Sequence, residues 1–468
     1  MSQVRVLNTI HVGPVQIDGL SPLRHGEQKL SFLDLLQISK TIQRLFFFDG
    51  PDLPPFPSVV SALRSSLAST LAIFLPLAGK LAFRPASGDV VIDFSAAAVS
   101  SGVKFVDAEF SGGADAMRRL ARDDEHDKEA FGQLVPALEA GQLPAPVLAV
   151  QVTRPAGEGG AVAVGVSIQH AVADGHAVWW FMRAWSTASR EGPGSLAAPG
   201  FVQPTFDRAG IRHPRADEIA RTVLSLVAPA LPLLRSTSAK PEILQQSRRT
   251  FVLRADEIRS LKQHILEQSR AVNGGEPCSK PPSTYVAISS LVWASVVQAR
   301  AASTRDADDV HLMVSADCRN RVRPPLGDAF FGTCVKPCFP RASAGDLRGE
   351  AGVARAAAAI QDAIRAHLEE LGDDSLSDTE SWMATFRGIP RERLVAVGSS
   401  NRFMAYETDF GWGAPSRVEL VSVFMRQMVT LLGARDGGVQ VSVALDGATT
   451  DAFAAGFRVP VPISCSGR

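Results

Sequence analysis

The residues best suited to chemistry are His170 and Asp174, which lie close together in the segment 168–175. Histidine titrates near neutral pH, so a positioned imidazole can act as a general base. Branched residues precede His170 at alternate positions, and this alternation predicts a strand with all of them on one face. These residues are Val162, Val164, Val166 and Ile168. His170 continues the same parity and is followed by an Asp-Gly turn signal, so the strand should deliver its imidazole to the edge of a cavity.

A structural role for His170 competes with this interpretation. A single histidine at the end of a strand is more often a structural residue, and His-x-x-x-Asp is short enough to arise by chance. His176, just beyond Asp174, is interpreted as a helix-start residue rather than as a catalytic one. A second signal elsewhere in the chain is therefore needed before His170 can be assigned to catalysis.

Helices and strands in both halves of the chain would position this motif. Apolar residues at helical spacing predict helices over 58–74, 175–188, 255–269, 283–302 and 351–368. Ser58 is the expected N-cap of the first of them. Alternating or β-branched runs predict strands over 161–170, 250–253, 310–314, 418–420 and 439–445. The segment 193–240 is rich in Pro, Ala and Arg and reads as a crossover connection. The mixture predicts an α/β protein of two domains.

Length and charge limit the classes of protein to which this chain can belong. The chain has 468 residues, 46% of them hydrophobic, which is enough for a large core. Its 48 basic and 48 acidic side chains give a formal net charge of zero. Without a basic excess, we expect neither a nucleic acid nor an anionic membrane surface as partner.

The cysteines and the N-terminus indicate a reducing compartment. Cys334 and Cys338 form a C-x-x-x-C pair, but no second Cys/His pair lies near enough to complete a zinc site, so no metal is expected. The N-terminal residues lack an apolar signal core, and no run of about 20 apolar residues is present. We therefore expect a cytoplasmic protein.

The second signal is the segment Asp409-Phe410-Gly411-Trp412-Gly413. Two glycines flanking a tryptophan make a tight backbone segment with one large anchor. Together with the His170 motif, in this order, it resembles the BAHD family of plant acyl-CoA-dependent acyltransferases. The resemblance covers essentially the whole chain. The segments 74–81 and 315–321, the latter followed by Pro324 and Pro325, are similar to further family motifs.

Two more segments resemble one branch of that family, the malonyltransferases of anthocyanin, flavonoid and other phenolic glucosides. Gln43-Arg44-Leu45-Phe46-Phe47-Phe48 is similar to the Gln-Arg-Leu-Phe-Phe run of this branch. Phe330-Phe331-Gly332-Thr333-Cys334 is similar to its Tyr-Phe-Gly-Asn-Cys motif, with Phe330 in place of Tyr and Thr333 in place of Asn.

The resemblance implies two chloramphenicol-acetyltransferase-like α/β domains with a solvent channel between them. We expect an N-terminal domain over 1–200, a crossover connection over 201–245 and a C-terminal domain over 246–468. The co-substrate would be acyl-CoA, with no permanently bound cofactor. The other partner would be a small-molecule hydroxyl acceptor, and the protein would be a monomer.

The resemblance also implies roles for single residues. His170 would deprotonate the acceptor hydroxyl, with Asp174 completing the catalytic pair. Asp174 would act architecturally, through an ion pair for which Arg319 is the candidate partner. Gly175 would allow the tight turn after the motif. Asp409, Phe410, Gly411, Trp412 and Gly413 would support the channel from a distance.

Candidate contacts to the acyl-CoA follow from charge and helix position. Coenzyme A carries phosphates, which helix N-termini and cations bind. Lys280, Ser283 and Thr284 stand at the predicted start of a helix that Ser283 or Thr284 would cap. Thr333 belongs to the segment that lies near the CoA end in the family. A malonyl carboxylate would favour a nearby arginine, and the candidates are Arg183 and Arg321.

The expected activity is transfer of malonyl from malonyl-CoA to a sugar hydroxyl of a phenolic, flavonoid or anthocyanin glucoside. An acetyl-CoA or hydroxycinnamoyl-CoA O- or N-acyltransferase is an alternative with the same chemistry. A non-catalytic family member acting as a binding protein would be expected to have lost His170 or Asp174, and both are present. A hydrolase using Cys334 is a further alternative, but no nucleophile-elbow motif surrounds it.

Overall fold

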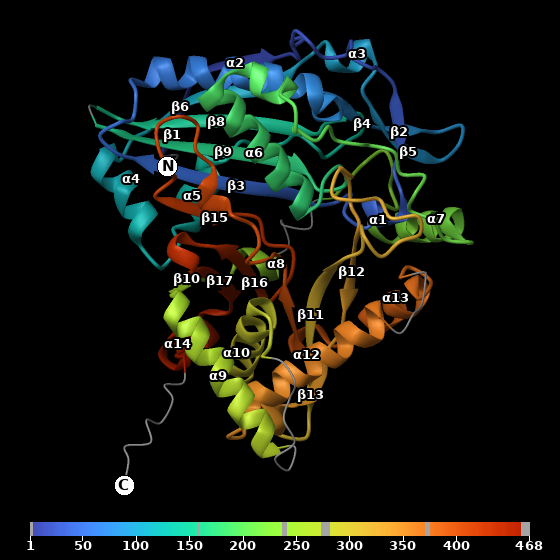
Figure 1. Cartoon of the computed structure of the whole chain (residues 1–468), viewed down its shortest axis with the longest axis vertical. Coiled ribbons are helices and arrows are strands. Elements are labelled where there is room, and N and C mark those ends of the chain that lie inside the picture. Colours follow the sequence, from blue (N-terminus) through green and yellow to red (C-terminus); the bar gives the residue numbers. More distant parts are fainter. Residues whose placement is uncertain (1–2, 158, 236–240, 273–280, 370–374, 460–468) are drawn as a thin grey trace. The chain divides into compact units, whose positions relative to one another are not determined.

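The computed structural model describes residues 1–468 except 1–2, 158, 236–240, 273–280, 370–374 and 460–468 (Figure 1). The chain divides into two compact units. The first unit comprises Met1–Lys240, Val322–Val335 and Met404–Phe424. The second comprises Pro241–Arg321, Lys336–Phe403 and Met425–Arg468. The chain therefore enters the first unit three times.

A six-stranded sheet forms the centre of the first unit. Its strands, in spatial order, are β1 (Val4–Val12), β6 (Val103–Phe110), β8 (Leu148–Pro155), β9 (Ala161–Gln169), β3 (Thr41–Asp49) and β15 (Arg417–Leu420). Neighbouring strands are antiparallel except β6 and β8, which are parallel. Every residue of β9 is buried, so both faces of the sheet are covered at this point.

Helices cover both faces of this sheet, as the alternation of side chains along β3 indicates (Figure 1). Phe46 packs edge-on against Trp179 of α6 (Gly175–Glu191), which lies beside α2 (Phe56–Ile73). Phe47 points the other way and contacts Phe131 of α5 (Lys128–Leu134), in a cluster that α4 (Gly113–Arg122) also joins. The even residues of β3 therefore face α6, and the odd residues face α4 and α5.

A second, smaller sheet of four strands belongs to the same unit. Its strands, in spatial order, are β2 (Glu27–Lys29), β5 (Asp89–Asp93), β4 (Lys80–Arg84) and β7 (Ala145–Pro146). The remaining helical elements of the unit are α1 (Phe32–Leu35), η1 (Leu75–Ala78), α3 (Ala96–Val99), η2 (Pro193–Ala197), α7 (Ala216–Val227) and η5 (Ala405–Glu407).

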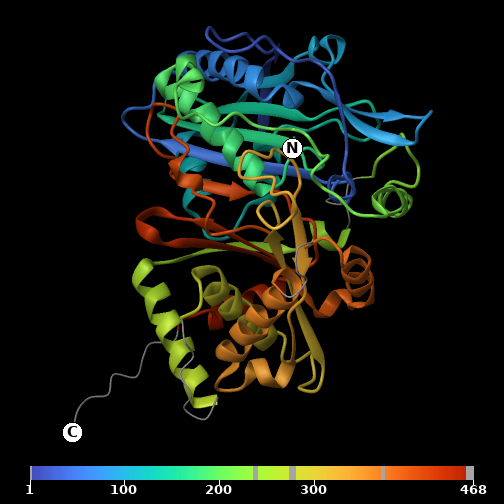
Figure 2. The same cartoon turned by 45° about the vertical axis from the view of Figure 1, so that its right-hand side comes forward.

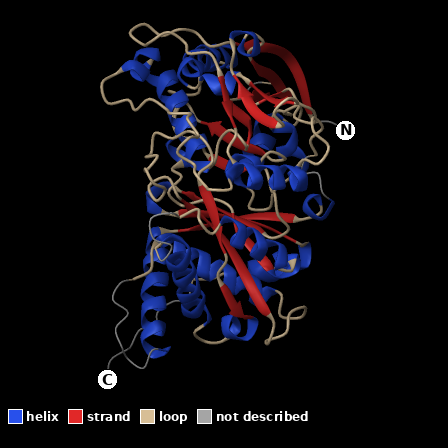
Figure 3. Ribbon diagram, turned by 90° about the vertical axis from the view of Figure 1, so that its right-hand side faces the viewer, coloured by secondary structure: helices blue, strands red, loops and turns tan. Residues whose placement is uncertain are grey.

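The second unit has its own sheet of seven strands. These are, in order, β10 (Ser247–Leu253), β17 (Val439–Leu445), β16 (Met428–Gly433), β14 (Leu394–Val397), β11 (Asp309–Asp317) and β12 (Val335–Cys338), with β13 (Arg341–Ser343) also paired to β11. β14 is parallel to both β16 and β11. Strands and helices are separated by colour in Figure 3.

Helices pack on the second sheet (Figure 2), and helices and sheet together form the buried core of this unit. The main ones are α9 (Ala255–Val272), α10 (Thr284–Ala299), α12 (Gly352–Leu368) and α14 (Gly447–Gly456). Shorter elements are α8 (Pro241–Leu244), α11 (Ala344–Arg348), α13 (Thr379–Gly388), η4 (Arg391–Arg393) and η6 (Arg435–Gly437). Apolar side chains of α9, α10 and α12 meet alternate residues of β17, Val439, Val441 and Val443, in one buried cluster. The mixed α/β class is therefore confirmed.

Most predicted elements are present, but two differ at informative places. The helix predicted from Ser58 begins at Phe56 with Pro55 as its N-cap residue, and the prediction of Ser58 as N-cap was wrong. Prolines are compatible with a first turn, whose N–H groups have no intrahelical partner. The patternless connection contains α7, in which Ile219 and Val223 are buried one turn apart, after Asp217 and Glu218 in the first turn.

The domain boundaries also differ from those expected. The end of the first long segment at Lys240 lies within the expected connection 201–245. The expected C-terminal domain, 246–468, however, included two segments that join the first unit. The second of these carries β15, whose residues pair with β3 through Val418 and Phe46. Strand pairing between positions this far apart leaves no local trace in a sequence.

Among the described residues, α2 is the one helix that meets the length and hydropathy expected of a membrane span. Half of this helix is buried within the structure. Its Leu63 carbonyl and Ser66 hydroxyl both accept hydrogen bonds from Trp185 Nε1 of α6, at 3.2 and 3.1 Å. The apolar character of α2 is thus explained by packing in the core of the first unit.

Candidate active site

The candidate site lies where β3 and β9 pair at one end. Their last register pair is Thr41 with Gln169, so Lys40 and His170 continue the ladder by one step. The His170 N–H donates to the Lys40 carbonyl at 3.0 Å. The even residues of β9, from Val162 to Ile168, stand opposite even residues of β3. They therefore share the face that α6 covers, and His170 continues their parity as predicted.

The His170 ring is held in one tautomer. Its Nδ1 lies 3.1 Å from the Ala173 carbonyl, which can only accept a hydrogen bond. Nδ1 therefore carries the proton, and Nε2 keeps the lone pair that a general base needs. The ring also lies 5.7 Å from the ring of Phe424, centroid to centroid. Local backbone geometry thus orients the imidazole without a carboxylate on Nδ1.

The pKa of His170 is lowered from its usual value to about 4. Burial is the main cause, since it disfavours the charged imidazolium, and the positive charge of Lys40 adds to the effect. The carboxylate of Asp174 and the Ala173 carbonyl act in the opposite direction but more weakly. His170 is therefore neutral, and able to accept a proton, throughout the physiological pH range.

Asp174 is almost fully buried, with 1% of its surface exposed. One carboxylate oxygen accepts the Ala177 N–H at 3.1 Å and caps α6. The other accepts the Cys334 N–H at 3.1 Å. Both contacts fix backbone around His170, while the architectural role expected for Asp174 through an ion pair stays a prediction. Gly175 opens α6 directly after this cap.

The segment Phe330–Cys334 lies beside the His170 turn, and Asp34 and Arg208 attach it. The Thr333 N–H donates to Asp34 Oδ1 at 3.0 Å, and the Thr333 hydroxyl lies 3.5 Å from the His170 carbonyl. Arg208 forms a buried ion pair with Asp34 at 3.4 Å. Its guanidinium also donates to the carbonyls of Phe331 and Val172, at 2.8 and 3.2 Å. These bonds join three distant parts of the chain around His170.

The segment Asp409–Gly413 packs on the helix that follows the motif. Asp409 Oδ1 accepts the N–H groups of Gly411 and Gly413 at 2.8 and 3.0 Å. Both glycines have positive φ, 108° and 93°, which other residues rarely adopt. Phe410 and Trp412 are buried against Phe48 of β3. The motif is thus a turn anchored by two aromatic rings.

This turn is tied to α6 as well. The Ser189 hydroxyl donates to the Phe410 carbonyl at 2.9 Å, and Arg190 donates to the Asp409 carbonyl at 3.1 Å. Phe410 also packs edge-on against Trp185 at 4.9 Å. The two sequence motifs therefore meet through α6, within one unit. The role expected for Asp409–Gly413, support of the channel from a distance, stays a prediction.

The structure places the residues expected to bind the acyl-CoA as follows. Arg183 is exposed on α6. Arg321 is exposed and donates to the Asp317 carbonyl at 2.8 Å. Lys280 lies outside the described residues. Ser283 caps α10, as predicted, by accepting the Val286 N–H at 3.2 Å, and Thr284 is the first residue of that helix.

Arg319, the expected partner of Asp174, is also buried, with 1% exposure. It forms an ion pair with Asp317 at 3.3 Å inside the second unit. Its pairing with Asp174 would join the two units and stays a prediction.

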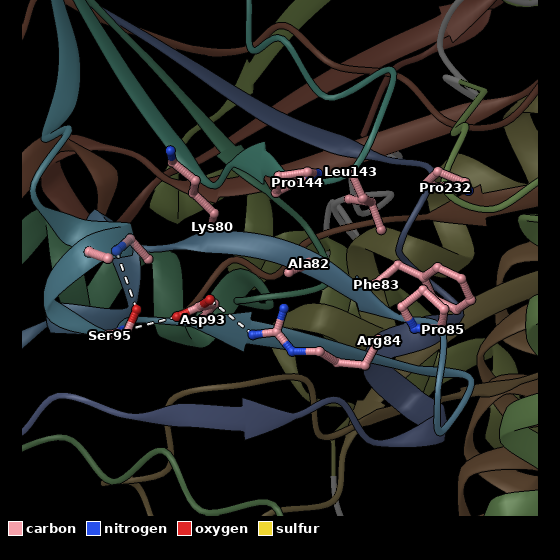
Figure 4. A pocket seen from close by; sticks show the side chains of 12 residues that line it. Lys80, Ala82, Phe83, Arg84, Pro85, Asp93, Ser95, Leu143, Pro144 and Pro232 are labelled. Carbon is pink, nitrogen blue, oxygen red and sulfur yellow. Dashed lines mark hydrogen bonds and ion pairs between the residues drawn. The ribbon is translucent and has the colours of Figure 1, made fainter.

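A cavity of about 520 Å³ lies elsewhere in the first unit, at the small sheet (Figure 4). Residues lining it include Lys80, Phe83, Arg84, Leu143, Pro144 and Pro232. Arg84 is already paired with Asp93 at 2.9 Å and with Glu27 at 2.8 Å. Lys80 is the one residue of the motif segments that lines it, and no residue of the His170 or Asp409–Gly413 motif does, so the cavity is not assigned to the reaction.

Three residues around His170 were not anticipated from the sequence: Lys40, Asp34 and Arg208. Lys40 stands directly before the run that opens β3, and its place opposite His170 follows only from the strand register. Asp34 lies in a capping box with Ser31 at the start of α1, which is a readable local signal. Arg208 lies in the connection that showed no pattern.

Comparison with known proteins supports the acyltransferase family that the sequence motifs resemble. The family model described as "Transferase family" matches residues 16–458. Phenolic glucoside malonyltransferase 1 of Arabidopsis thaliana is 28% identical over 95% of both chains. From the same organism, coumaroyl-CoA:anthocyanidin 3-O-glucoside-6''-O-coumaroyltransferase 2 is 27% identical over 96% of this chain and 95% of its own. BAHD acyltransferase DCR is 31% identical over 83% and 77%, respectively.

Solved structures share the fold. The crystal structure of vinorine synthase matches with a TM-score of 0.71 at 20% identity, covering 96% of each chain. F. sporotrichioides TRI101 complexed with coenzyme A and T-2 matches with a TM-score of 0.63 at 18% identity, over 92% of this chain and 97% of its own. The two-domain chloramphenicol-acetyltransferase-like architecture of these proteins is therefore the architecture of this chain.

Proposed function

Because this chain belongs to the Transferase family of BAHD acyl-CoA-dependent acyltransferases, we propose that it transfers malonyl from malonyl-CoA to a glucoside. The acceptor is a sugar hydroxyl of a phenolic, flavonoid or anthocyanin glucoside. The observation that carries the catalytic assignment is the tautomer of His170, whose Nδ1–H is bound to Ala173 and whose Nε2 is left to accept a proton. The malonyl donor is supported by the relative from Arabidopsis thaliana named as a phenolic glucoside malonyltransferase.

The chemistry requires one base and two bound substrates. His170 Nε2 removes the proton of the acceptor hydroxyl as its oxygen attacks the thioester carbonyl. The tetrahedral oxyanion collapses, the C–S bond breaks, and the CoA thiolate takes the proton from the imidazolium. General base catalysis of this kind contributes roughly 10²–10⁴-fold to the rate. No acyl-enzyme forms, because both substrates are held together in one complex.

The remaining motif residues hold His170 in place. Asp174 fixes the start of α6 and the Phe330–Cys334 segment, and Asp34 with Arg208 holds that segment from the other side. Asp409–Gly413 secures the far part of α6. These contacts matter because a small displacement of a general base strongly reduces its contribution to the reaction rate.

One relative, and one difference from the malonyltransferase-like motif, favour a second acyl donor. The coumaroyltransferase resembles this chain over almost its whole length. Thr333 also replaces the asparagine of the malonyltransferase-like motif, and its hydroxyl lies near the His170 carbonyl. A hydroxycinnamoyl-CoA is therefore the second candidate.

The test is a donor and acceptor screen followed by mass spectrometry. The purified protein is incubated with malonyl-CoA, acetyl-CoA or coumaroyl-CoA, each with phenolic glucosides and with the matching aglycones. We expect a malonyl mass gain on the glucosides and none on the aglycones. Transfer from coumaroyl-CoA alone, or acylation of the aglycones, would contradict the proposal.

A further inference from the structure

Lys40 is the cation beside the catalytic histidine in the first unit. Its carbonyl accepts the His170 N–H at 3.0 Å. Its ammonium lies 5.8 Å from the centre of the Phe424 ring, and the His170 ring lies 5.7 Å from the same ring. Lys40 and His170 share one strand face by register, so Phe424 lies against both side chains. The ammonium is therefore close to where the thioester must sit.

The charge of Lys40 has no carboxylate partner among the described residues. Its hydrogen bond goes to the neutral amide oxygen of Gln37, at 2.8 Å. Burial lowers the pKa of Lys40 to about 8, so the ammonium stays mostly protonated at neutral pH. A partly buried cation without an anion is destabilising, and a protein rarely keeps one without use. The place of Lys40 next to His170 suggests that the missing anion belongs to a substrate.

Other cations near the motif are already engaged or face elsewhere. Arg208 is paired with Asp34 in the core. Arg44 lies on the same strand face but four residues further along β3, over the ring of Trp179. Arg183, one of the two arginines expected for a malonyl carboxylate, is exposed on α6. Lys40 is thus the residue of the first unit best placed to meet an anionic acyl group at His170.

We propose that Lys40 binds the free carboxylate of the malonyl donor and so selects malonyl-CoA over neutral acyl donors. This inference rests on the proposed function, because it concerns the donor of the same reaction. The carboxylate of malonyl-CoA is one methylene away from the thioester carbonyl. When that carbonyl is within reach of a hydroxyl bound at His170 Nε2, the carboxylate must lie beside the same histidine. An ammonium there forms a charge-assisted hydrogen bond that acetyl-CoA cannot form.

The test compares two donors across variants of Lys40. Lys40→Met keeps the unbranched apolar stem of the side chain and removes its charge, and Lys40→Arg keeps the charge. Loss of a buried charged hydrogen bond is expected to lower kcat/KM for malonyl-CoA by roughly 10–100-fold in Lys40→Met. The value for acetyl-CoA should stay within about 3-fold of wild type, because the neutral donor makes no such contact. Lys40→Arg should retain most of the preference for malonyl-CoA.

A surface lysine provides the matched control. Lys104 on β6 is paired with Glu139 at 3.1 Å, and Lys104→Met should leave both donors unchanged. Equal losses for both donors in Lys40→Met, or no loss, would overturn the inference while leaving malonyl transfer by the wild type intact. A wild-type protein that transfers acetyl but not malonyl would instead overturn the proposed function, and the inference with it.

The pH dependence gives a second readout that a purely structural role would not produce. Since the pKa of Lys40 is about 8, KM for malonyl-CoA should rise above that pH in the wild type as the ammonium loses its proton. In Lys40→Arg this rise should disappear, because the guanidinium stays charged. The groups acting on His170 are Lys40 and Asp174, and only the first changes in these variants. A KM that rises equally in both proteins would contradict the assignment.

Discussion

The surroundings of His170, rather than a partner carboxylate, suit it to the proposed base catalysis. The Ala173 carbonyl fixes the tautomer, while burial and the charge of Lys40 lower the pKa to about 4. In many sites that pair histidine with aspartate, the aspartate orients the imidazole. Here Asp174 accepts two backbone N–H groups instead. The two residues of the motif therefore have separate tasks.

The lowered pKa of His170 predicts the pH profile of the reaction. Only the neutral imidazole accepts a proton, so activity should persist as the pH falls and be lost on passing through the lowered pKa. We expect the acid limb of kcat, measured at saturating acetyl-CoA to avoid the titrating malonyl carboxylate, to have a midpoint near the value of about 4 rather than 6.5. Circular dichroism at each pH separates this titration from unfolding. An acid limb at or above 6.5 would refute the electrostatic account.

Replacing Asp174 should affect both stability and activity. Asp174→Ala removes the cap of α6 and leaves the Cys334 N–H without this acceptor. We expect the free energy of unfolding, from urea denaturation, to fall by roughly 1–3 kcal/mol, with a large loss of turnover in the remaining folded protein. Asp446→Ala, which removes an exposed cap of α14, is the matched control. It should lower stability modestly and leave turnover unchanged; the opposite pattern would count against the positioning role.

Among the elements, α6 connects the two motifs that are far apart in the sequence. It begins at the Asp174 cap and ends near Asp409–Gly413, which Ser189 and Arg190 hold. Packing of Phe410 against Trp185 and of Trp179 against Phe46 joins this helix to the turn and to β3. Damage to the distant turn should therefore reach His170 through one rigid helix.

Gly411 offers a sharp test of that turn. At a φ of 108° an alanine is strained, which typically costs about 1–3 kcal/mol, although the space around it is sufficient. Gly411→Ala should thus lower the free energy of unfolding and the turnover number together. Gly132→Ala in α5, at an exposed helical position with open space, is the control and should stabilise slightly. Equal effects of the two substitutions would show that the turn does not need glycine.

Local sequence patterns predicted most helices and strands, but they failed where a contact between residues far apart in the sequence decides the structure. The strand before His170 and the helix after it follow from alternation and helical spacing, and both are present. The start of α2 was missed because Ser58 is a common cap type, whereas the chain uses prolines in the first turn. Lys40 was missed because only the pairing of β3 with β9 brings it opposite His170.

At the scale of the molecule, the first unit is built from three separate stretches of chain. β15 pairs with β3 at one side of the sheet, and Thr333 and Cys334 supply backbone donors to Asp34 and Asp174. No periodic pattern within either stretch indicates which distant strand or carboxylate it contacts. The sequence therefore predicted two domains but not their discontinuous boundary. The family resemblance supplied the function that local patterns could not.

This organisation predicts that residues 1–240 do not fold by themselves. The fragment would lack β15, the aromatic anchors Phe410 and Trp412, and the N–H donors that satisfy two buried carboxylates. Each of the two buried carboxylates would lose one hydrogen bond, and the sheet would lose an edge strand, so we expect no cooperative thermal transition in the fragment, in contrast to the whole chain. Calorimetry on both proteins makes the comparison. A fragment that melts cooperatively at the temperature of the whole chain would contradict the three-stretch unit.

The central claim is that His170 is the general base of an acyl-CoA transfer. The most direct test measures kcat for His170→Ala beside His176→Ala, which alters the neighbouring histidine that bonds to the Asp328 carbonyl at 3.1 Å. With folding checked by circular dichroism, we expect His170→Ala to lose roughly 10²–10⁴-fold in kcat. His176→Ala should remain near wild type. A folded His170→Ala protein that keeps kcat within about 3-fold of wild type would contradict the account.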